Sequence, residues 1–88
     1  MTTLAQKNKE PEPVATEVSF TDDMICLTLE DGREIRTPLE FYPRLAKAKK
    51  EQLKNYRLLG GGTGIHWEDL DEDLSVESIV LGRRAYNG

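Results

Sequence analysis

Four glycines stand within the five positions of residues 60–64, and Ile65, His66 and Trp67 follow them directly. Glycine loses more conformational freedom on folding than any other residue, so a glycine run is retained where the backbone needs unusual dihedral angles or a close approach to another strand. The sequence therefore predicts a wide turn or bulge at residues 60–64 that returns Ile65 and Trp67 to the core. Any fold for this chain must contain a turn that residues with side chains would not form.

Two nucleotide-binding motifs that use glycines do not fit this segment. A P-loop requires Gly-Lys-Ser or Gly-Lys-Thr after its spacer, whereas Gly64 is followed by Ile65 and His66. The dinucleotide-binding fingerprint requires a further small residue where Ile65 stands, and no parallel strand-helix unit surrounds it. The glycines therefore favour a structural turn over a phosphate-binding loop.

Size and composition limit the classes of protein to consider. The chain has 88 residues and a formal net charge of -4, and 38% of its residues are hydrophobic. So small a domain buries a modest core, so we expect a partner or a second copy to cover further apolar surface. Cys26 is the single cysteine and no secretory signal opens the chain, which predicts a cytoplasmic location. No apolar run reaches the roughly 20 residues of a membrane helix, so no membrane association is expected.

Residues 14–37 predict three antiparallel strands in a meander. The first is expected at 14–20, with Val14, Thr16, Val18 and Phe20 on one face. The second, at 24–29, alternates between Ile25, Leu27 and Leu29 on one face and Met24, Cys26 and Thr28 on the other; we interpret Cys26 as an inert small core residue. Asp31 and Gly32 predict a type I′ hairpin turn, which leads into a third strand at 34–37.

The second half of the chain predicts two helices and one further strand. Pro38 ends the third strand, and Pro43 suits the first position of a helix. One amphipathic helix is expected from Arg44 to Asn55, lying on the sheet. Residues 56–59 and 64–67 look extended, which predicts a short, irregular fourth strand. Ser75 and Gly82 fit the two ends of a last helix over 76–81.

These elements make up a single α+β domain over residues 14–82. It consists of an antiparallel β-meander of three strands plus a short irregular fourth strand, packed by one amphipathic helix and followed by a short C-terminal helix. The polar, proline-containing residues 1–13 are expected to form a disordered tail, and residues 83–88 a flexible one.

The acidic stretch after Trp67 invites a metal-site hypothesis. Asp69, Asp71 and Asp73 imitate the start of a calcium-binding EF-hand loop, but Leu74 stands where that loop requires glycine and Val80 where it requires glutamate. A solvated acidic turn that favours the N-terminus of the following helix explains the same residues, with a weak divalent-cation site as the alternative. We predict no metal ligands and no cofactor.

His66 is the only histidine, and strand alternation sends it and Trp67 to opposite faces. If Trp67 anchors the core, His66 points outward beside Glu68. A general base needs a nucleophile and an orienting partner nearby, and the sequence supplies no complete set. We therefore predict no catalytic residues and a protein that is not an enzyme.

Basic residues gather in the predicted helix 44–55, whereas residues 68–77 contain no lysine or arginine. One side of that helix could follow a phosphate backbone. The net negative charge and the lack of a base-reading motif nevertheless argue against nucleic acid as a partner. The residues that would carry this alternative are Arg44, Lys47, Lys50 and Lys54.

Several short motifs follow one another along the chain. They are Asp31-Gly32-Arg33, Pro38-Leu39, Phe41-Tyr42-Pro43-Arg44-Leu45, Gly64-Ile65-His66-Trp67 and Leu70-Asp71-Glu72-Asp73-Leu74-Ser75. In this order the sequence from about Val14 to Gly82 resembles the bacterial family called domain of unknown function 2442 (DUF2442). The resemblance implies a small α+β domain with an antiparallel sheet, found alone or joined to a C-terminal helix-turn-helix.

The same resemblance bears on function. It implies a protein often encoded beside another small uncharacterised protein, an arrangement similar to toxin–antitoxin pairs, and it supplies no catalytic residues. Because the chain ends at Gly88 without room for a helix-turn-helix, we expect no transcriptional role for this polypeptide alone.

The sequence thus predicts a small protein-binding module, antitoxin-like or accessory in a two-protein bacterial system. We expect a small protein partner and allow for a homo-oligomer. The first alternative is a nucleic-acid-associated regulator, and the second is a metal-binding protein or enzyme centred on His66 and the acidic turn. The predicted contact residues are Gly62, Gly64, His66, Trp67, Asp71 and Asp73.

Overall fold

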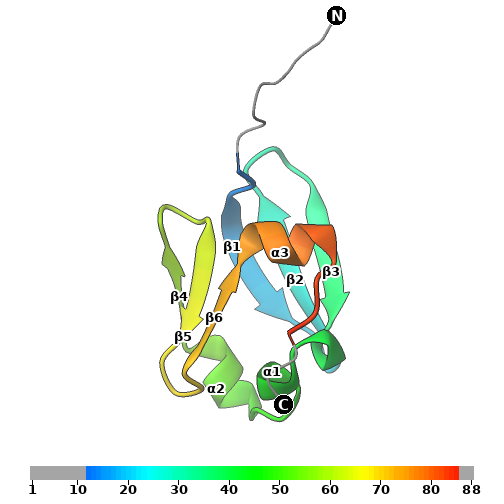
Figure 1. Cartoon of the computed structure of the whole chain (residues 1–88), viewed down its shortest axis with the longest axis vertical. Coiled ribbons are helices and arrows are strands. Elements are labelled where there is room, and N and C mark those ends of the chain that lie inside the picture. The colour runs from blue at the N-terminus through cyan, green and yellow to red at the C-terminus, as the bar shows by residue number, and fades with distance from the viewer. Residues whose placement is uncertain (1–11, 86–88) are drawn as a thin grey trace, which may run out of the picture.

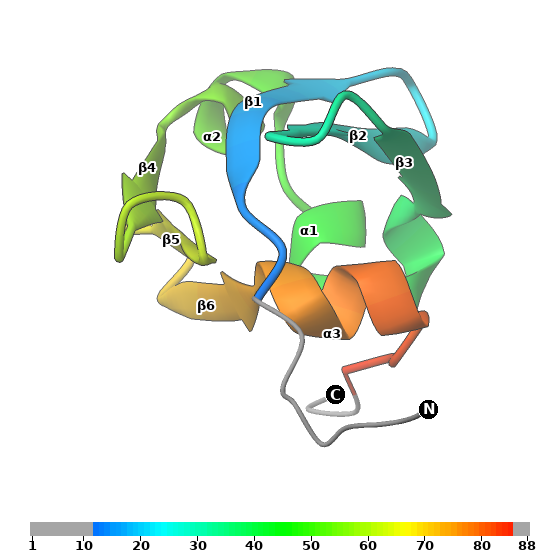
Figure 2. The same ribbon diagram turned by 90° about the horizontal axis from the view of Figure 1, so that it is seen from above.

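Two three-stranded antiparallel sheets share one hydrophobic core in the computed structural model, which describes residues 12–85. Figures 1 and 2 show the two sheets, with the last helix, α3, lying across one side. The α+β class is confirmed. The strands are β1 (Ala15–Phe20), β2 (Met24–Leu29), β3 (Glu34–Pro38), β4 (Tyr56–Leu59), β5 (Gly64–Trp67) and β6 (Glu72–Ser75). The helices are the short 3-10 helix η2 (Leu39–Phe41), α1 (Pro43–Ala46), α2 (Lys50–Lys54) and α3 (Val76–Leu81).

The first sheet follows the strand order β1-β2-β3, as the predicted meander requires. Strand β2 has the expected bounds, and Ile25, Leu27 and Leu29 are buried. Cys26 lies on the other face and is partly exposed, so the prediction that it is a core residue is wrong.

Strand β1 contains an irregularity that the sequence did not indicate. Its pairing with β2 shifts between Ala15 and Glu17, so Thr16 has no paired residue and lies exposed. Ala15 and Val18 therefore face the core, and the predicted alternation from Val14 through Thr16 is wrong on the N-terminal side of this bulge.

The loop of the β2–β3 hairpin is one residue longer than the predicted type I′ turn. Gly32 has a φ of 95°, but Asp31 has no positive φ, so the turn is not type I′. The carbonyl of Leu29 accepts from the Gly32 N–H at 2.9 Å, and the Leu29 N–H donates to the Arg33 carbonyl at 2.8 Å. This is the three-residue loop with a glycine bulge, in which only the glycine adopts the left-handed conformation.

The single amphipathic helix predicted from Arg44 to Asn55 is wrong, because the chain forms α1 and α2 with a break between them. Lys49 has an extended conformation, and its N–H donates to the Gln52 side chain at 2.9 Å, which starts α2. The break reorients the chain so that Leu45 in α1 and Leu53 in α2 both reach the core. Ala46 in α1 is exposed.

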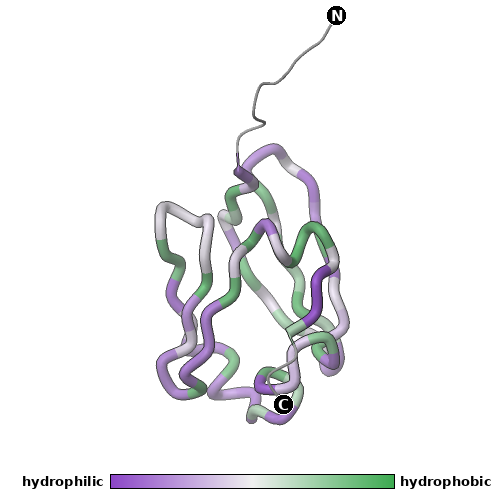
Figure 3. The backbone as a smooth tube through the Cα atoms, viewed as in Figure 1, coloured by the Kyte–Doolittle hydropathy of each residue, from purple (hydrophilic) through white to green (hydrophobic). Residues whose placement is uncertain are grey.

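The irregular fourth strand is also corrected, since the second half of the chain builds a complete second sheet in the order β4-β5-β6. Strands β4 and β5 pair in regular register, with Leu58 opposite Ile65. Strand β6 was not predicted, because Glu72 and Asp73 belong to a mostly hydrophilic stretch that resembles a turn (Figure 3). Glu72 is nevertheless buried in β6.

The C-terminal part agrees with prediction and extends beyond it. The Ser75 hydroxyl accepts from the Ser78 N–H at 3.0 Å, and Gly82 ends α3 with a φ of 78°, as expected of these cap positions. Ala85 then donates its N–H to the Phe41 carbonyl at 3.0 Å, so ordered structure continues past Gly82. The remaining parts of the two expected tails lie outside the described residues. Among residues 12–85 no helix has the length and apolar character that crossing a bilayer requires.

The glycine turn joins the two sheets. Gly60, Gly61 and Gly62 have φ values of 58°, 72° and 112°, and the Gly62 carbonyl accepts from the Ala15 N–H at 2.8 Å. A Cβ atom on Gly62 would lie 2.4 Å from the Ala15 carbonyl oxygen. The expected turn, with its unusual dihedral angles and close backbone approach, is confirmed.

Replacing Gly62 by alanine should destabilise the domain more than replacing another glycine of similar φ. Gly32→Ala serves as the control, because a Cβ at Gly32 would meet nothing within 4 Å. We expect a cost of about 1–2 kcal/mol for Gly32→Ala, from dihedral strain alone, and at least about 3 kcal/mol for Gly62→Ala, where backbone overlap adds to it. Urea unfolding followed by Trp67 fluorescence measures both values; equal costs would contradict the close approach.

A second prediction concerns the buried hydroxyl of Tyr42, which has no hydrogen-bond partner among the described residues. Removing an unsatisfied buried group relieves its desolvation cost, so Tyr42→Phe should leave stability unchanged or raise it by about 1 kcal/mol. Tyr56 is the matched control, because its hydroxyl donates to the Val18 carbonyl at 3.3 Å, and Tyr56→Phe should cost about 1 kcal/mol. A larger loss for Tyr42→Phe in thermal unfolding would overturn the interpretation.

Candidate partner-binding surface

Trp67, a predicted partner-contact residue, is buried beneath the protein surface and is not exposed on it. Its ring is fully buried, its indole N–H donates to the Leu53 carbonyl at 3.0 Å, and it forms an edge-to-face pair with Phe20. Gly62 is buried as well, against β1. These two predicted contact residues can therefore shape a partner surface only through β5 and the turn that they position.

His66 points outward from the second sheet, as predicted. Pairing in that sheet places Arg57, His66 and Asp73 side by side on three adjacent strands. One ring nitrogen of His66 contacts the Asp73 carboxylate, and the other lies 2.9 Å from Glu68 Oε1. Arg57 approaches the same Glu68 oxygen at 3.8 Å. We call these four residues the outer charged row.

The outer charged row faces the solvent. The His66 side chain is 18% exposed, but its two carboxylate partners are 79% and 72% exposed, so no water-poor cleft surrounds the imidazole. Both ring nitrogens are already occupied by different carboxylates, which leaves neither directed at a common ligand. Within residues 12–85 no group of three or more histidine, cysteine or acidic side chains could hold a metal ion.

Hydrogen bonding in this row raises the pKa of His66. The Asp73 carboxylate is the main cause and Glu68 the second, because both favour the protonated imidazole. The outer charged row links β5, β6 and the turn between them most strongly when the imidazole is protonated.

Arg44 stabilises the acidic turn, residues 68–71, which joins β5 to β6. Asp71 has a positive φ of 51°, unusual for a residue with a side chain, and its carbonyl accepts from Arg44 at 2.8 Å. The same guanidinium lies 3.8 Å from the buried Glu72 carboxylate. Burial raises the pKa of Glu72, and the nearby Arg44 charge offsets only part of that increase. Arg44 thus has a structural role in this turn. Gly64 begins β5, where an added Cβ would make only ordinary contacts.

The basic residues proposed for nucleic-acid contact do not form one row. The break between α1 and α2 separates Arg44 and Lys47 from Lys50 and Lys54. Arg44 is engaged with the acidic turn, and Lys50 lies 3.2 Å from Asp22. The geometry therefore offers this alternative less support than a continuous helix face would have given.

The sequence predicted residues 56–59 as extended, but it did not show that they form β4 at the edge of a second sheet. Strand β4 lies at the end of its sheet and presents Leu58 at 37% and Leu59 at 41% exposure. Leu59 stands opposite Gly64, which has no side chain to cover it. Two adjacent leucines in a strand point to opposite faces, so the Leu58-Leu59 pair before the glycines was the available signal.

Comparison with known proteins agrees with this architecture. A family model described as "Protein of unknown function (DUF2442)" matches residues 15–85. The chain belongs to the DUF2442 family. The resemblance seen in the sequence is therefore confirmed.

Two solved structures are similar to this DUF2442 domain. A crystal structure of a protein of unknown function from Rhodospirillum rubrum is 30% identical, with a TM-score of 0.76 over 88% of this chain and 95% of the other. A solution structure of an uncharacterised protein from Chromobacterium violaceum is 25% identical, with a TM-score of 0.70 over 84% of this chain and 70% of the other. None of the curated proteins matches this chain.

The outer charged row predicts a pH dependence of stability. Because the pKa of His66 is raised in the folded state, its contribution is fully present below the unfolded pKa of 6.5 and is lost as pH rises through the folded pKa. The unfolding free energy of the wild type minus that of His66→Gln should therefore shrink between pH 6 and pH 9. Titration of the His66 ring proton by NMR should also give a pKa above 6.5.

Two variants separate the causes of this shift. Asp73→Asn should lower the pKa of His66 more than Glu68→Gln, because Asp73 makes the larger contribution. A His66 pKa at or below 6.5 in the wild type, or an unchanged His66 pKa in both variants, would show that the contacts of the outer charged row do not persist in solution.

Proposed function

We propose that this DUF2442 domain is a protein-binding module that captures an extended segment of a small partner protein along the edge of β4. The supporting observation is the exposure of Leu58 and Leu59 on a strand at the end of its sheet. An edge strand carries unpaired backbone N–H and C=O groups, and an added strand satisfies them while side-chain contacts select the partner.

The side chains of β4 indicate what kind of segment fits. Leu58 and Leu59 lie on opposite faces of the strand, so they can contact successive apolar side chains of an added strand. Arg57 is exposed although it lies 3.8 Å from Glu68, and Lys54, exposed just before the strand, forms no ion pair within residues 12–85. This basic and apolar edge favours a partner segment with aliphatic residues and at least one acidic residue.

The partner role we favour is the accessory or antitoxin-like half of a two-protein bacterial system. Its support is the family resemblance, which implies a small neighbouring protein, together with the modest core of an 88-residue chain. The single cysteine suits such a role in a reducing cytoplasm.

A non-catalytic function is part of the same proposal. The imidazole of His66 is engaged on both sides by carboxylates that are themselves largely exposed. A general base needs a nitrogen directed at the reacting group, usually in a site from which water is excluded. The outer charged row is better suited to stiffening the sheet that presents β4.

Recovery of the tagged protein from its native host tests this function. We expect a small protein to co-purify with the wild type and its recovery to fall at least about tenfold, or about 1.4 kcal/mol of binding free energy, for the double variant Leu58→Lys with Leu59→Lys. Ala46→Lys, at an exposed position of α1, is the control and should retain the partner. Circular dichroism verifies that both variants are folded.

Three results would count against the proposal. The wild type could be recovered without any partner, or the double variant could retain it. Light scattering could also show that the wild type forms a dimer that the double variant abolishes, in which case a second copy occupies the β4 edge.

A further inference from the structure

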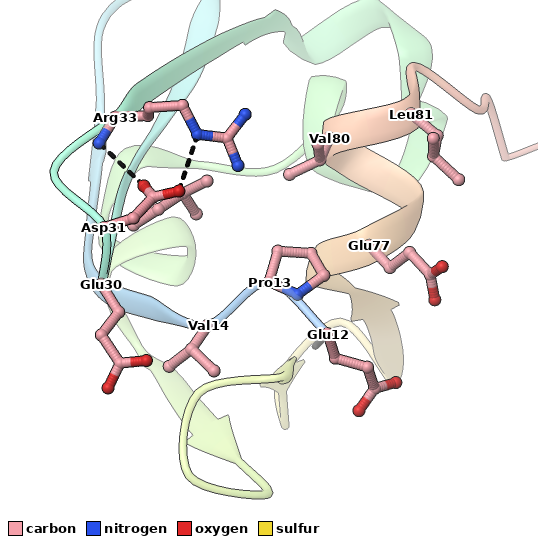
Figure 4. Close-up of a pocket in the computed structure, with 10 residues that line it drawn as sticks. Glu12, Pro13, Val14, Glu30, Asp31, Arg33, Glu77, Val80 and Leu81 are labelled. Carbon is pink, nitrogen blue, oxygen red and sulfur yellow. Dashed lines mark hydrogen bonds and ion pairs between the residues drawn. The ribbon is translucent and has the colours of Figure 1, made fainter. Parts of the chain in front are cut away.

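A groove of about 500 Å³ lies between α3, the β2–β3 hairpin loop and the segment that leads into β1 (Figure 4). It shares no lining residue with β4. Its walls are held in place by the backbone, since the Glu30 N–H donates to the Val14 carbonyl at 2.8 Å. The groove is within the size range of about 300–1,000 Å³ that is typical of binding pockets.

The floor of the groove is apolar. Leu29 is buried beneath it, Val14 and Val80 are half-buried, and Leu81 is 56% exposed. Leu81 is the most exposed large hydrophobic residue described in this chain. Figure 4 shows Val80 and Leu81 on α3, with Val80 directed toward the hairpin loop and Leu81 at the outer end of the groove, directed away from that loop. The floor can therefore cover one or two aliphatic side chains.

The rim of the groove is acidic. Glu12, Glu30 and Glu77 line it, and no cation of residues 12–85 forms an ion pair with them. Of the described residues that line the groove, Arg33 is the one cation, and it is paired with Asp31 at 2.9 Å, so it does not offset the other three carboxylates. Figure 4 shows Arg33 and Asp31 joined on the hairpin wall, while Glu12 and Glu77 extend toward the opposite side.

The charge of the rim selects the occupant. Among residues 12–85 these three carboxylates have no ion-pair partner, and they repel phosphate groups, which argues against nucleic acid or an anionic lipid surface at this site. They attract lysine and arginine, and the floor beneath them favours aliphatic groups.

We propose that this groove binds a protein segment in which one or two aliphatic residues are flanked by lysine or arginine. The aliphatic side chains cover Val14, Val80 and Leu81, and the flanking cations pair with Glu12, Glu30 and Glu77. This inference rests on the proposed protein-binding function, but it identifies a second contact surface of opposite charge to the edge of β4.

A binding experiment with a defined peptide tests the groove directly. The probe is a short fluorescein-labelled peptide with two central leucines flanked by lysines, titrated into the full chain and followed by fluorescence anisotropy and by methyl NMR signals. We expect the signals of Val14, Val80 and Leu81 to shift, and the affinity to fall as salt rises, because exposed charges are screened. The same peptide with glutamates in place of lysines should bind at least tenfold more weakly.

Variants of the protein sharpen the test. Reversing two rim charges with Glu30→Lys and Glu77→Lys should weaken the lysine peptide at least tenfold, whereas Glu51→Lys on α2 should change its affinity less than twofold. Leu81→Ser keeps every charge of the rim and should also weaken binding, so the test stands even if the double reversal impairs folding. Equal binding of the two peptides, or unmoved methyl signals at the groove, would overturn the proposal.

The outcome is separable from that of the proposed function. If the peptide binds the groove but no protein co-purifies from the native host, the groove stands and the β4 proposal fails. If a partner co-purifies through Leu58 and Leu59 while the lysine peptide leaves the groove unmoved, only the groove proposal fails. Groove signals that shift with an anionic vesicle or a short DNA duplex, and not with the peptide, would also reject it.

Discussion

The backbone contact between Gly62 and Ala15 is the constraint on which the arrangement of the two sheets depends. It brings a carbonyl oxygen so close to the glycine Cα that no side chain fits between them. The turn that makes this contact also starts β5, and β5 directs Trp67 into the core and His66 into the outer charged row. The absence of side chains at the glycines thus permits the turn that positions groups on both faces of the second sheet.

The two proposed surfaces differ in charge, and each places exposed leucine near charged groups. The edge of β4 combines Leu58 and Leu59 with Arg57, whereas the groove combines Leu81 with Glu30 and Glu77. Each pairing provides apolar area for affinity and charge for partner selection. Internal contacts engage several charges of the domain, since Arg44 and His66 contact the segment of residues 68–73, Arg57 lies near Glu68, and Arg33 pairs with Asp31.

The sequence correctly predicted those elements that are determined by residues close together in the chain. Strand β2 and helix α3 were located correctly, because alternation and the caps Ser75 and Gly82 depend on neighbours in sequence. The division of the long helix, the bulge at Thr16 and strand β6 were missed, because tertiary packing decides them. Glu72 illustrates the reason: it is buried in a strand beside Arg44, which is distant in sequence, and no local pattern indicates that contact. The sequence predicted that His66 and Trp67 face opposite sides of a strand, but it could not show that Leu58 and Leu59 lie on an edge strand.

The strand order in each sheet follows the order of the chain, so every strand pairs with one that is adjacent in sequence. Pairings of this kind close short loops and form early, whereas contacts between distant segments carry a larger loop-closure entropy. Each half of the chain can therefore assemble its own ribbon of hairpins before the halves dock. Trp67 of β5 packs beside Phe20 of β1, so its complete burial requires that the two ribbons come together.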